Sequence, residues 1–268
     1  MVHIFINEHM KEVADSSTVF SVRDSVKPDA DIVIYNGFPI AQNCQLRDND
    51  TLVFIKRGEM PHPDELDALL TARHTPFVHE KLKHAIVGIA GCGGLGSTIA
   101  VALARSGIGS LILADFDVVE PSNLNRQQFF IDQIGMHKVE ALRQTIQRVN
   151  PNVTIRLFQG MVTEDNCADV FAGASVIVEA FDKAEYKSRL VNHILTTMPG
   201  IFIVAGNGMA GYGPNDAIVT QKIGSHFFVC GDGVSEAQPG SGLMAPRVGI
   251  CAHEQANQVL RIILGEDV

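Results

Sequence analysis

Several features that define other classes of protein are missing from this sequence of 268 residues. No Lys/Arg-rich run occurs and the formal net charge is −9, so the sequence lacks the electrostatic footprint of a nucleic-acid-binding surface. The five cysteines are scattered and form no Cys-x-x-Cys pair, which argues against a disulfide framework and a four-cysteine zinc site. No apolar run approaches the ~18 residues of a membrane span, and the N-terminus lacks the pattern of a secretory signal. We therefore expect a reducing, cytoplasmic location, with no nucleic-acid or membrane partner.

Repeats, low-complexity tracts and two common hydrolase signatures are missing as well. Neither a Ser-His-Asp pattern nor a His-Glu-x-x-His zinc motif is found. Hydrophobic residues make up 46% and charged residues 19%, which is typical of a globular protein. The length predicts one large domain, or a large domain and a small one.

The first part of the chain, residues 2–57, reads as a small strand-rich unit. "VHIFIN" alternates at period two, "DIVIYNG" and "TLVFIKRG" are short apolar runs that end in Gly, and "TVFSVRDSV" could form a short helix between them. The prolines of "GEMPHPDELDALL" then break strand pairing and suit the start of a helix. We expect a domain over residues 1–58, a linker and helix over 59–84, and a second domain over 85–268.

From residue 85 onward, buried strands alternate with helical patterns. The predicted strands are "HAIVGIAG", "SLILADF", "TIRLFQG", "ASVIVEAF" and "FIVAGNG", and a final amphipathic helix covers "RVGICAHEQANQVLRIIL". This alternation predicts an α/β domain with a parallel sheet covered on both faces. "GNGMAGYGPND" and "GDGVSEAQPGSG" are expected to be loops, the second long enough to cross the site.

A glycine loop follows the first of these strands. Gly91, Gly93 and Gly96 fit Gly-x-Gly-x-x-Gly at the start of a helix, where backbone and helix N-terminus can approach a phosphate. Asp115 and Asp117 end the next strand, where a carboxylate can accept hydrogen bonds from ribose hydroxyls. The simpler alternative is a glycine turn that only lets strand and helix pack closely.

Polar side chains beyond this acid favour a triphosphate over a nicotinamide cofactor. Arg126 can neutralise phosphate charge bidentately, Asn123 can donate to a phosphate oxygen, and Lys138 lies on the next predicted helix. Arg126 and Lys138 could instead be a solvated surface pair.

Five motifs in order resemble those of one superfamily. "GCGGLG", "DFDVVEPSNLNRQ", "IGMHK", "EAFD" and "GLMAPRVG" are similar to motifs of the ubiquitin-activating-type adenylyltransferases, the ThiF/MoeB/HesA superfamily. The resemblance covers about residues 73–266 and is strongest to ThiF-type enzymes of thiamine biosynthesis that carry a ThiS-like N-terminal domain. It implies a Rossmann-like, doubly wound, mostly parallel sheet, preceded by a small α+β β-grasp (ubiquitin-like) domain.

The resemblance also implies a reaction and a site. ATP and magnesium would adenylylate the C-terminal glycine of a small β-grasp sulfur carrier ending in Gly-Gly, with release of pyrophosphate. Gly91, Gly93, Gly94 and Gly96 would form the loop under the nucleotide, and Asp115 would bind the ribose. Asn123 and Arg126 would bind phosphates, and Lys138 would stabilise charge on the α-phosphate. Asp182 would bind magnesium. Asp182 could alternatively be a helix N-cap.

A homodimer is implied too, in which Arg73 reaches the nucleotide of the opposite subunit. Arg73 could equally be a surface residue. The sequence departs from the pattern in lacking zinc-binding Cys-x-x-Cys pairs, so zinc is not expected. An arginine that relatives place after the magnesium aspartate is matched here only by Lys187 or Arg189. Cys230 lies near the segment in which some relatives carry a cysteine that bonds the carrier, although a lone Cys is often just a small apolar residue.

The N-terminal unit resembles a ThiS-like β-grasp carrier but is not expected to be a substrate. A carrier presents a free Gly-Gly carboxylate, whereas here only Gly58 precedes Glu59 and the chain continues into the next helix. We expect this unit to dock on the catalytic domain or its dimer partner, the alternative being a passive fusion.

Three other functions stay open at this point. An NAD-dependent oxidoreductase would use the glycine loop and the acid but gives no role to Asn123, Arg126, Lys138 and Asp182. A non-catalytic module that holds a β-grasp partner is the second. The third is activation of another acceptor, such as the molybdopterin-synthase carrier or a tRNA nucleoside.

Overall fold

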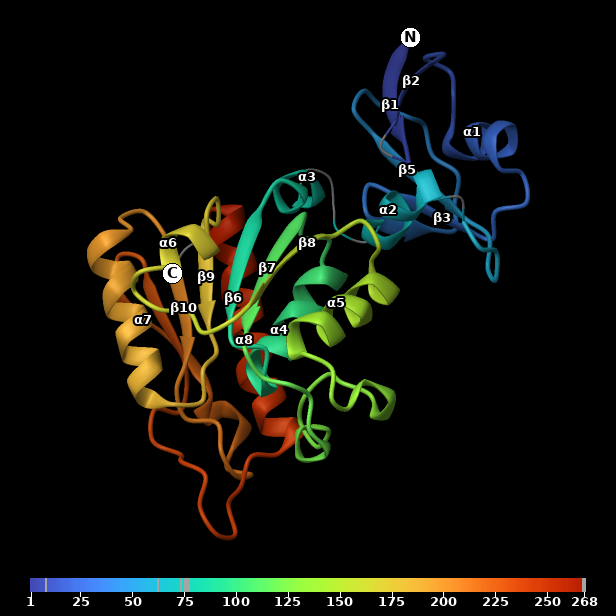
Figure 1. Ribbon diagram of the computed structural model, residues 1–268. Helices are drawn as coiled ribbons and strands as arrows, with labels where there is room; N and C mark the ends of the chain where they lie inside the picture. Colours follow the sequence, from blue (N-terminus) through green and yellow to red (C-terminus); the bar gives the residue numbers. More distant parts are fainter. Residues whose placement is uncertain (8, 62, 73, 75–77, 267–268) are drawn as a thin grey trace. The chain divides into compact units, whose positions relative to one another are not determined.

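A computed structural model of the chain describes residues 1–7, 9–61, 63–72, 74 and 78–266 (Figure 1). The chain divides into two compact units, Met1–Glu80 and Lys81–Val268. In the described part of the chain, no helix combines the length and the apolar character needed to cross a membrane.

The N-terminal unit is built on a five-stranded sheet in the order β2-β1-β5-β3-β4. Its elements are β1 (Val2–Ile6), β2 (His9–Val13), α1 (Val19–Val26), β3 (Ile32–Tyr35), β4 (Phe38–Ile40), β5 (Thr51–Ile55) and α2 (Pro63–Thr71). Strands β1 and β5 are parallel, and the other pairs are antiparallel. Helix α1 starts at the N-cap Thr18, whose side chain accepts a hydrogen bond from the Ser21 N–H at 3.2 Å. This is the β-grasp arrangement that the family resemblance implies.

Both faces of this sheet are apolar and both are covered. Because side chains alternate along a strand, Val33 points to the face packed by α1, while Ile34 points to the opposite face. On that second face Ile34 and Val53 are buried against Leu69 and Ala72, at and just beyond the end of α2. Helix α2, which the sequence places in the segment 59–84, therefore packs on the sheet of the N-terminal unit.

The C-terminal unit holds a seven-stranded sheet in the order β11-β12-β10-β9-β6-β7-β8. Its strands are β6 (Ile86–Ala90), β7 (Ser110–Asp115), β8 (Thr154–Gln159), β9 (Val176–Glu179), β10 (Phe202–Gly206), β11 (Val219–Gly224) and β12 (Phe227–Gly231). All pairs are parallel except β11 with β12. The predicted α/β class with a mostly parallel, doubly wound sheet is confirmed.

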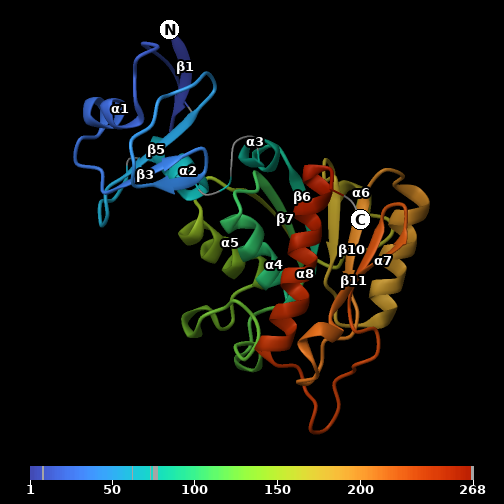
Figure 2. The ribbon, with the colours of Figure 1, turned by 180° about the vertical axis from the view of Figure 1, so that it is seen from behind.

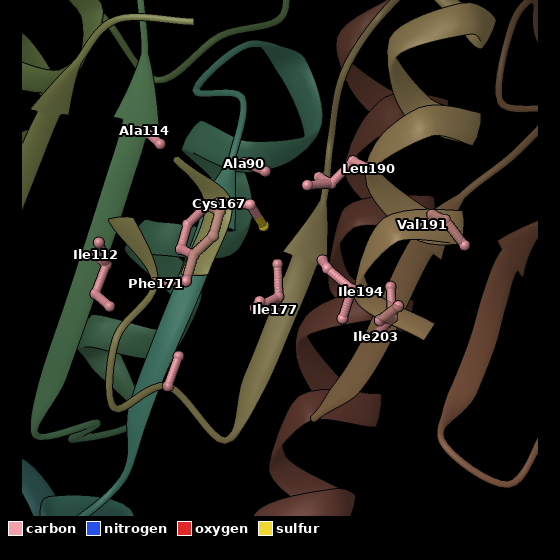
Figure 3. Packing of buried hydrophobic residues seen from close by; sticks show 11 residues of the cluster. Ala90, Ile112, Ala114, Cys167, Phe171, Ile177, Leu190, Val191, Ile194 and Ile203 are labelled. Atoms are coloured by element: carbon pink, nitrogen blue, oxygen red, sulfur yellow. The ribbon is translucent and has the colours of Figure 1, made fainter. Parts of the chain in front are cut away.

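Helices cover the two faces of the larger sheet. They are α4 (Gly94–Arg105), α5 (Lys138–Val149), α6 (Cys167–Val170), α7 (Ala184–Thr197) and α8 (Ala245–Leu264), while α3 (Val78–Lys83) crosses the division between the units. Helices α4, α5 and α8 lie on one face (Figure 2), and α6 and α7 on the other. Figure 3 shows Ile194 of α7 beside Ile177 of β9 and Ile203 of β10, all three fully buried. These two helix layers fix the sheet in place, and the candidate site lies at the carboxyl ends of its strands.

Candidate active site

The candidate site lies where the order of the strands reverses. Strand β6 is central, and Ala90 at its end pairs with Ala114 of β7 on one side and with Glu179 of β9 on the other. The chain runs from β6 to β7 and β8 on the first side before it returns to β9 on the second. Such a switch point leaves a crevice at the carboxyl ends of the strands, where open α/β sheets bind ligands. A cavity of about 770 Å³ occupies this position.

Most of the site residues expected from the sequence line this one cavity. They are Gly91, Gly93, Gly94, Asp115, Asn123, Arg126, Lys138 and Asp182. Gly96 is not part of this lining, and Arg73 lies outside the described residues. Loops that follow three different strands therefore bring together residues up to 91 positions apart, from Gly91 to Asp182.

The glycines of the loop serve two different purposes. Gly91 has φ +96°, and a Cβ there would lie 2.7 Å from the carbonyl oxygen of Ala180. At Gly93, the N-cap of α4, the nearest atom to a Cβ would be 3.7 Å away, so the loop is open to a ligand there. Gly93 also has no side chain to cap the first-turn N–H groups, which leaves them for an anion. A Cβ at Gly96 would lie 1.8 Å from the Gly91 carbonyl oxygen. Gly96 therefore lets α4 pack against the loop, and its place under a nucleotide stays a prediction.

Asp115 lies at the base of the cavity with both carboxylate oxygens engaged. Oδ2 accepts a hydrogen bond from the Cys92 N–H at 2.6 Å, and Oδ1 accepts one from the Asp117 N–H at 2.8 Å. Burial raises the pKa of the Asp115 carboxyl group above its ordinary value, although these two N–H groups and Lys138 oppose the effect. Each oxygen keeps a further lone pair, so the carboxylate can also accept from sugar hydroxyls.

Lys138 is the first residue of α5, where a cation is unfavourable for the helix dipole. Asp117 compensates, because its Oδ2 accepts from Lys138 Nζ at 2.7 Å and its carbonyl accepts from the Lys138 N–H at 2.9 Å. The Lys138 side chain is 9% exposed, against 48% for Asp117. The lysine is thus a nearly buried, positioned cation at the cavity wall.

Asn123 and Arg126 come from one short turn. Asn123 ends the 3₁₀ turn η1 (Pro121–Asn123), and its Oδ1 accepts from the Glu120 N–H at 3.0 Å, so its amide nitrogen is oriented by its own turn. Nη1 of Arg126 donates to the Ser122 carbonyl at 3.2 Å. The Arg126 side-chain carbons would lie 3.6 and 3.7 Å from a Cβ at Gly94, which places this guanidinium stem directly over the glycine loop.

The loop after β9 adds an acid and a second lysine. Asp182 is exposed and lines the cavity. Of the two basic residues that follow it, Lys187 lines the cavity, while Arg189 pairs with Glu185 at 2.7 Å on the surface, 64% exposed. Among the described residues, no three His, Cys, Asp or Glu side chains gather as a metal site.

Comparison with known proteins assigns the chain to a family. The family model described as ThiF family matches residues 69–268, and a second model, ThiS-like ubiquitin, matches residues 2–58. The chain belongs to the ThiF family. The structure of this ThiF-family chain also resembles that of Escherichia coli tRNA N6-threonylcarbamoyladenosine dehydratase, TcdA, in complex with ATP, with a TM-score of 0.66 and 23% identity over 74% of this chain and 93% of that one.

Two curated relatives of this ThiF-family chain have different names. Molybdopterin-synthase adenylyltransferase of Salmonella typhimurium is 29% identical over 194 residues, which cover 69% of this chain and 75% of the relative. Adenylyltransferase and sulfurtransferase UBA4 of Saccharomyces cerevisiae is 30% identical over 192 residues, 69% of this chain. The match spans only 43% of the yeast protein.

Two features of the ThiF-family chain, one in the cavity lining and one buried behind it, were not expected from its sequence. Gln127 is buried at 8% exposure and lines the cavity beside Gly93. Glu179 is fully buried at the end of β9, forms an ion pair with Lys187, and accepts from the Phe181 N–H at 2.7 Å. Burial raises the pKa of the Glu179 carboxyl group, and Lys187 opposes this shift. An acid inside the apolar run "VIVEAF" was the signal that could have identified the pair.

The sequence position of Cys230 suggests a crossing loop, but the residue does not lie on one. It is a fully buried residue of β12, with Sγ 3.3 Å from the Thr220 hydroxyl. Burial raises the pKa of its thiol to about 11, although the hydrogen bond with Thr220 lowers it. A thiolate is the reactive form of cysteine, so this position does not suit a covalent role with a carrier.

Proposed function

We propose that this ThiF-family chain is an ATP-dependent adenylyltransferase that activates the C-terminal carboxylate of a small ubiquitin-like sulfur carrier protein. The observation that carries the proposal is the convergence of the glycine loop, Asp115, Arg126, Lys138 and Asp182 on one cavity at the switch point of the sheet. The names of the Salmonella typhimurium and Saccharomyces cerevisiae relatives, which are both adenylyltransferases, support it.

The cavity offers donors and acceptors in the arrangement that a nucleotide requires. Asp115, deep beside the loop, would accept from the ribose hydroxyls. The open backbone at Gly93 and the first turn of α4 would receive phosphate oxygens. Arg126 over Gly94 and the amide of Asn123 would bind the phosphates from the opposite side. A cavity of about 770 Å³ has the size of a small-molecule site.

The reaction requires no general base in this proposal. The carrier carboxylate is already a nucleophile, its oxygen bonds to the α-phosphorus, and the bond to the pyrophosphate leaving group breaks. The barrier is electrostatic, since an anion approaches a polyanion, and oriented cations lower it by about 3 kcal/mol for each donor. Lys138, held by Asp117, is positioned to neutralise charge that develops on the α-phosphate.

Asp182 fits the proposed magnesium site by its chemistry. Magnesium prefers oxygen ligands and is often held by one or two carboxylates together with substrate phosphates. Asp182 is an exposed carboxylate at the cavity, so the phosphates can complete the coordination. The bound ion would supply positive charge at the phosphates.

The acceptor is the finer part of the proposal. The relatives are named for molybdopterin synthase and for a sulfurtransferase, and TcdA for a tRNA nucleoside. The net charge of −9 disfavours a polyanionic RNA acceptor. We therefore place a protein carrier before an RNA acceptor. The match of residues 2–58 to a ThiS-like model favours a carrier of the thiamine type first and of the molybdopterin-synthase type second.

ATP–pyrophosphate exchange tests this function. The purified chain, with magnesium and ATP, is assayed against a panel of small proteins ending in Gly-Gly, which includes thiamine-type and molybdopterin-type carriers. We expect exchange that depends on one carrier and is lost when its last glycine is removed. Binding of NAD in preference to ATP, or exchange with a tRNA alone, would contradict the proposal.

A further inference from the structure

Arg247 is a buried cation in an unfavourable place. It lies in the first turn of α8, after Pro246, where the helix dipole opposes positive charge, and its side chain is 5% exposed. Its Nη2 donates to Asp232 Oδ2 at 2.6 Å. Its Nη1 donates to the carbonyl groups of Gly213 and Pro214, at 2.7 and 2.8 Å. One guanidinium therefore joins the start of α8 to two separate loops.

Asp232 extends the same network into the second loop. Its Oδ1 accepts from the N–H groups of Val234 and Ser235, at 2.9 and 2.8 Å, and its own N–H donates to the Gly208 carbonyl at 3.0 Å. Burial alone would raise the pKa of Asp232, but the hydrogen bonds from Ser235, Val234 and Arg247 hold it well below its usual value. Asp232 therefore accepts these hydrogen bonds as a carboxylate.

The two loops tied by this network form one wall of the nucleotide cavity. Residues Gly208, Met209 and Ala210 line the cavity from the first loop, and Ser235, Glu236 and Ala237 from the second. Arg247 itself is not part of that lining; it borders a neighbouring hollow of about 630 Å³ that shares Ala210 and Ser235 with the cavity. Its influence on the cavity must therefore pass through the loops that it holds.

The next residue of α8 contacts the glycine loop. Val248 is buried at 2% exposure, and its Cγ1 would lie 3.1 Å from a Cβ at Gly94. Val248 thus contacts the glycine loop, while the adjacent Arg247 fixes the loops that follow β10 and β12. Helix geometry sets the spacing between these two contacts, because consecutive residues point about 100° apart.

We infer that Arg247 is a positioning residue, which holds the wall formed by residues 208–210 and 235–237. This part of the lining contains none of the residues assigned to ATP and is therefore left for the acceptor tail. That Arg247 fixes this wall rests on its hydrogen bonds alone. That the acceptor is a carrier tail rests on the proposed function. Loss of Arg247 would loosen the acceptor side of the cavity and leave the glycine loop, held by Val248, in place.

Amide hydrogen exchange of the free full-length chain tests the fixed wall without any activity. In Arg247→Met, which keeps length without charge, we expect the amides of 208–213 and 232–237 to exchange about tenfold faster or more, and those of 91–96 to stay unchanged. Asp232→Asn should show the same pattern and serves if Arg247→Met does not fold. Arg261→Met, at the other end of α8, is the control. Unchanged exchange in both segments would overturn the inference.

Steady-state kinetics then separates positioning from mere structural support. Arg247→Met should raise the KM for the carrier about tenfold while the Kd for ATP changes less than about threefold, and Arg247→Lys should recover part of the loss. Faster amide exchange with an unchanged carrier KM would overturn the positioning role. If the wild-type chain activates no carrier, the proposed function fails, and amide exchange still decides whether Arg247 holds the wall.

Discussion

At the scale of single residues, neighbouring groups hold the two cations of the cavity, Lys138 and Arg126, in place. Lys138 is nearly buried and Asp117 is half exposed, so the proposed phosphate has one positioned cation to meet. Arg126 is bound chiefly by its own turn, through the Ser122 carbonyl at 3.2 Å and the Asn125 side chain at 2.8 Å. Both cations line the cavity, so both are available to a nucleotide bound there.

The proposed roles of Arg126 and Asp182 predict loss of activity without loss of fold. Arg126→Ala and Asp182→Ala should each lower pyrophosphate exchange by about two orders of magnitude, since each removes a charge worth about 3 kcal/mol in the transition state. Arg189→Ala, which removes an exposed arginine paired only with Glu185, is the matched control and should retain activity. Full activity of Arg126→Ala, with circular dichroism unchanged, would refute its role.

The buried position of Cys230 predicts an inert thiol. With a pKa of about 11, only about one thiol in a thousand is ionised at pH 8, so alkylation by iodoacetamide should modify Cys230 only after unfolding. Cys44, which is partly exposed, should react first in the native chain. Mass spectrometry of peptides gives the order, and Cys230→Ala should keep exchange within about twofold. Rapid native modification of Cys230 with loss of activity would contradict this prediction.

Residues whose place depends on a local motif were predictable, and residues that depend on tertiary contacts were not. Gly91 and Asp115 belong to one continuous strand-helix-strand unit, so their proximity can be predicted from their spacing along the chain. Arg247 is close to its partner Asp232 only because α8 returns to the loop after β12. No local pattern encodes that contact.

At the scale of elements, apolar runs predict the buried strands and the edge strand β8, whereas the strands at the other edge, β11 and β12, are not predicted. Strands β6, β7 and β9 are apolar runs because helices cover both of their faces. The edge strand β11, "VTQKIG", is largely exposed and carries few apolar residues, so it has no such signal. Strand β12, "FFVCG", does have a short apolar run and was still not identified as a strand.

Gly96 and Gly249 predict opposite responses to the same substitution in two helices. A Cβ at Gly96 would lie 1.8 Å from the backbone oxygen of Gly91, so Gly96→Ala must displace the loop and should destabilise the chain by about 3 kcal/mol. At Gly249, in α8, a Cβ would meet no atom within 4 Å, so Gly249→Ala should raise the free energy of unfolding by up to ~1 kcal/mol. Urea denaturation followed by circular dichroism compares them. Equal effects at both positions would contradict the packing role of Gly96.

At the scale of the whole molecule, the chain after β5 is fastened to its own unit instead of ending in a free tail. Glu59 forms an ion pair with Lys27 at 2.5 Å, and the Arg57 N–H donates to Asp31 at 2.9 Å. Helix α2 then covers the second face of the same sheet. A truncation meant to remove this unit but keep Arg73 should start near Ala72, because a start near Pro61 would leave α2 without its packing partner.

The N-terminal unit should therefore not be adenylylated by its own chain. After incubation with ATP and magnesium alone, peptide mass spectrometry should find no adenylyl group on residues 1–80, because no free Gly-Gly carboxylate exists there. A modified N-terminal unit would refute this. Exchange and carrier KM unchanged in a chain that starts near Ala72, which keeps Arg73, would favour a passive fusion over a docking role.

The homodimer expected from the family resemblance predicts complementation between inactive subunits. Arg73→Ala and Asp182→Ala should each be inactive alone, and their mixture should regain part of the activity, because a mixed dimer pairs one intact Arg73 with one intact Asp182 across the interface. Light scattering checks the dimer. A mixture that dimerises but never regains activity would count against an Arg73 that acts in trans.

The central claim is transfer of an adenylyl group to a carrier carboxylate, and intact-mass spectrometry of the carrier measures it most directly. The carrier that supports exchange is incubated with the chain, ATP, magnesium and pyrophosphatase, then quenched in acid. The account predicts a gain of one adenylyl mass on the carrier, absent for the carrier without its last glycine and for the Asp182→Ala chain. An unmodified carrier, or a label found only on the chain itself, would contradict it.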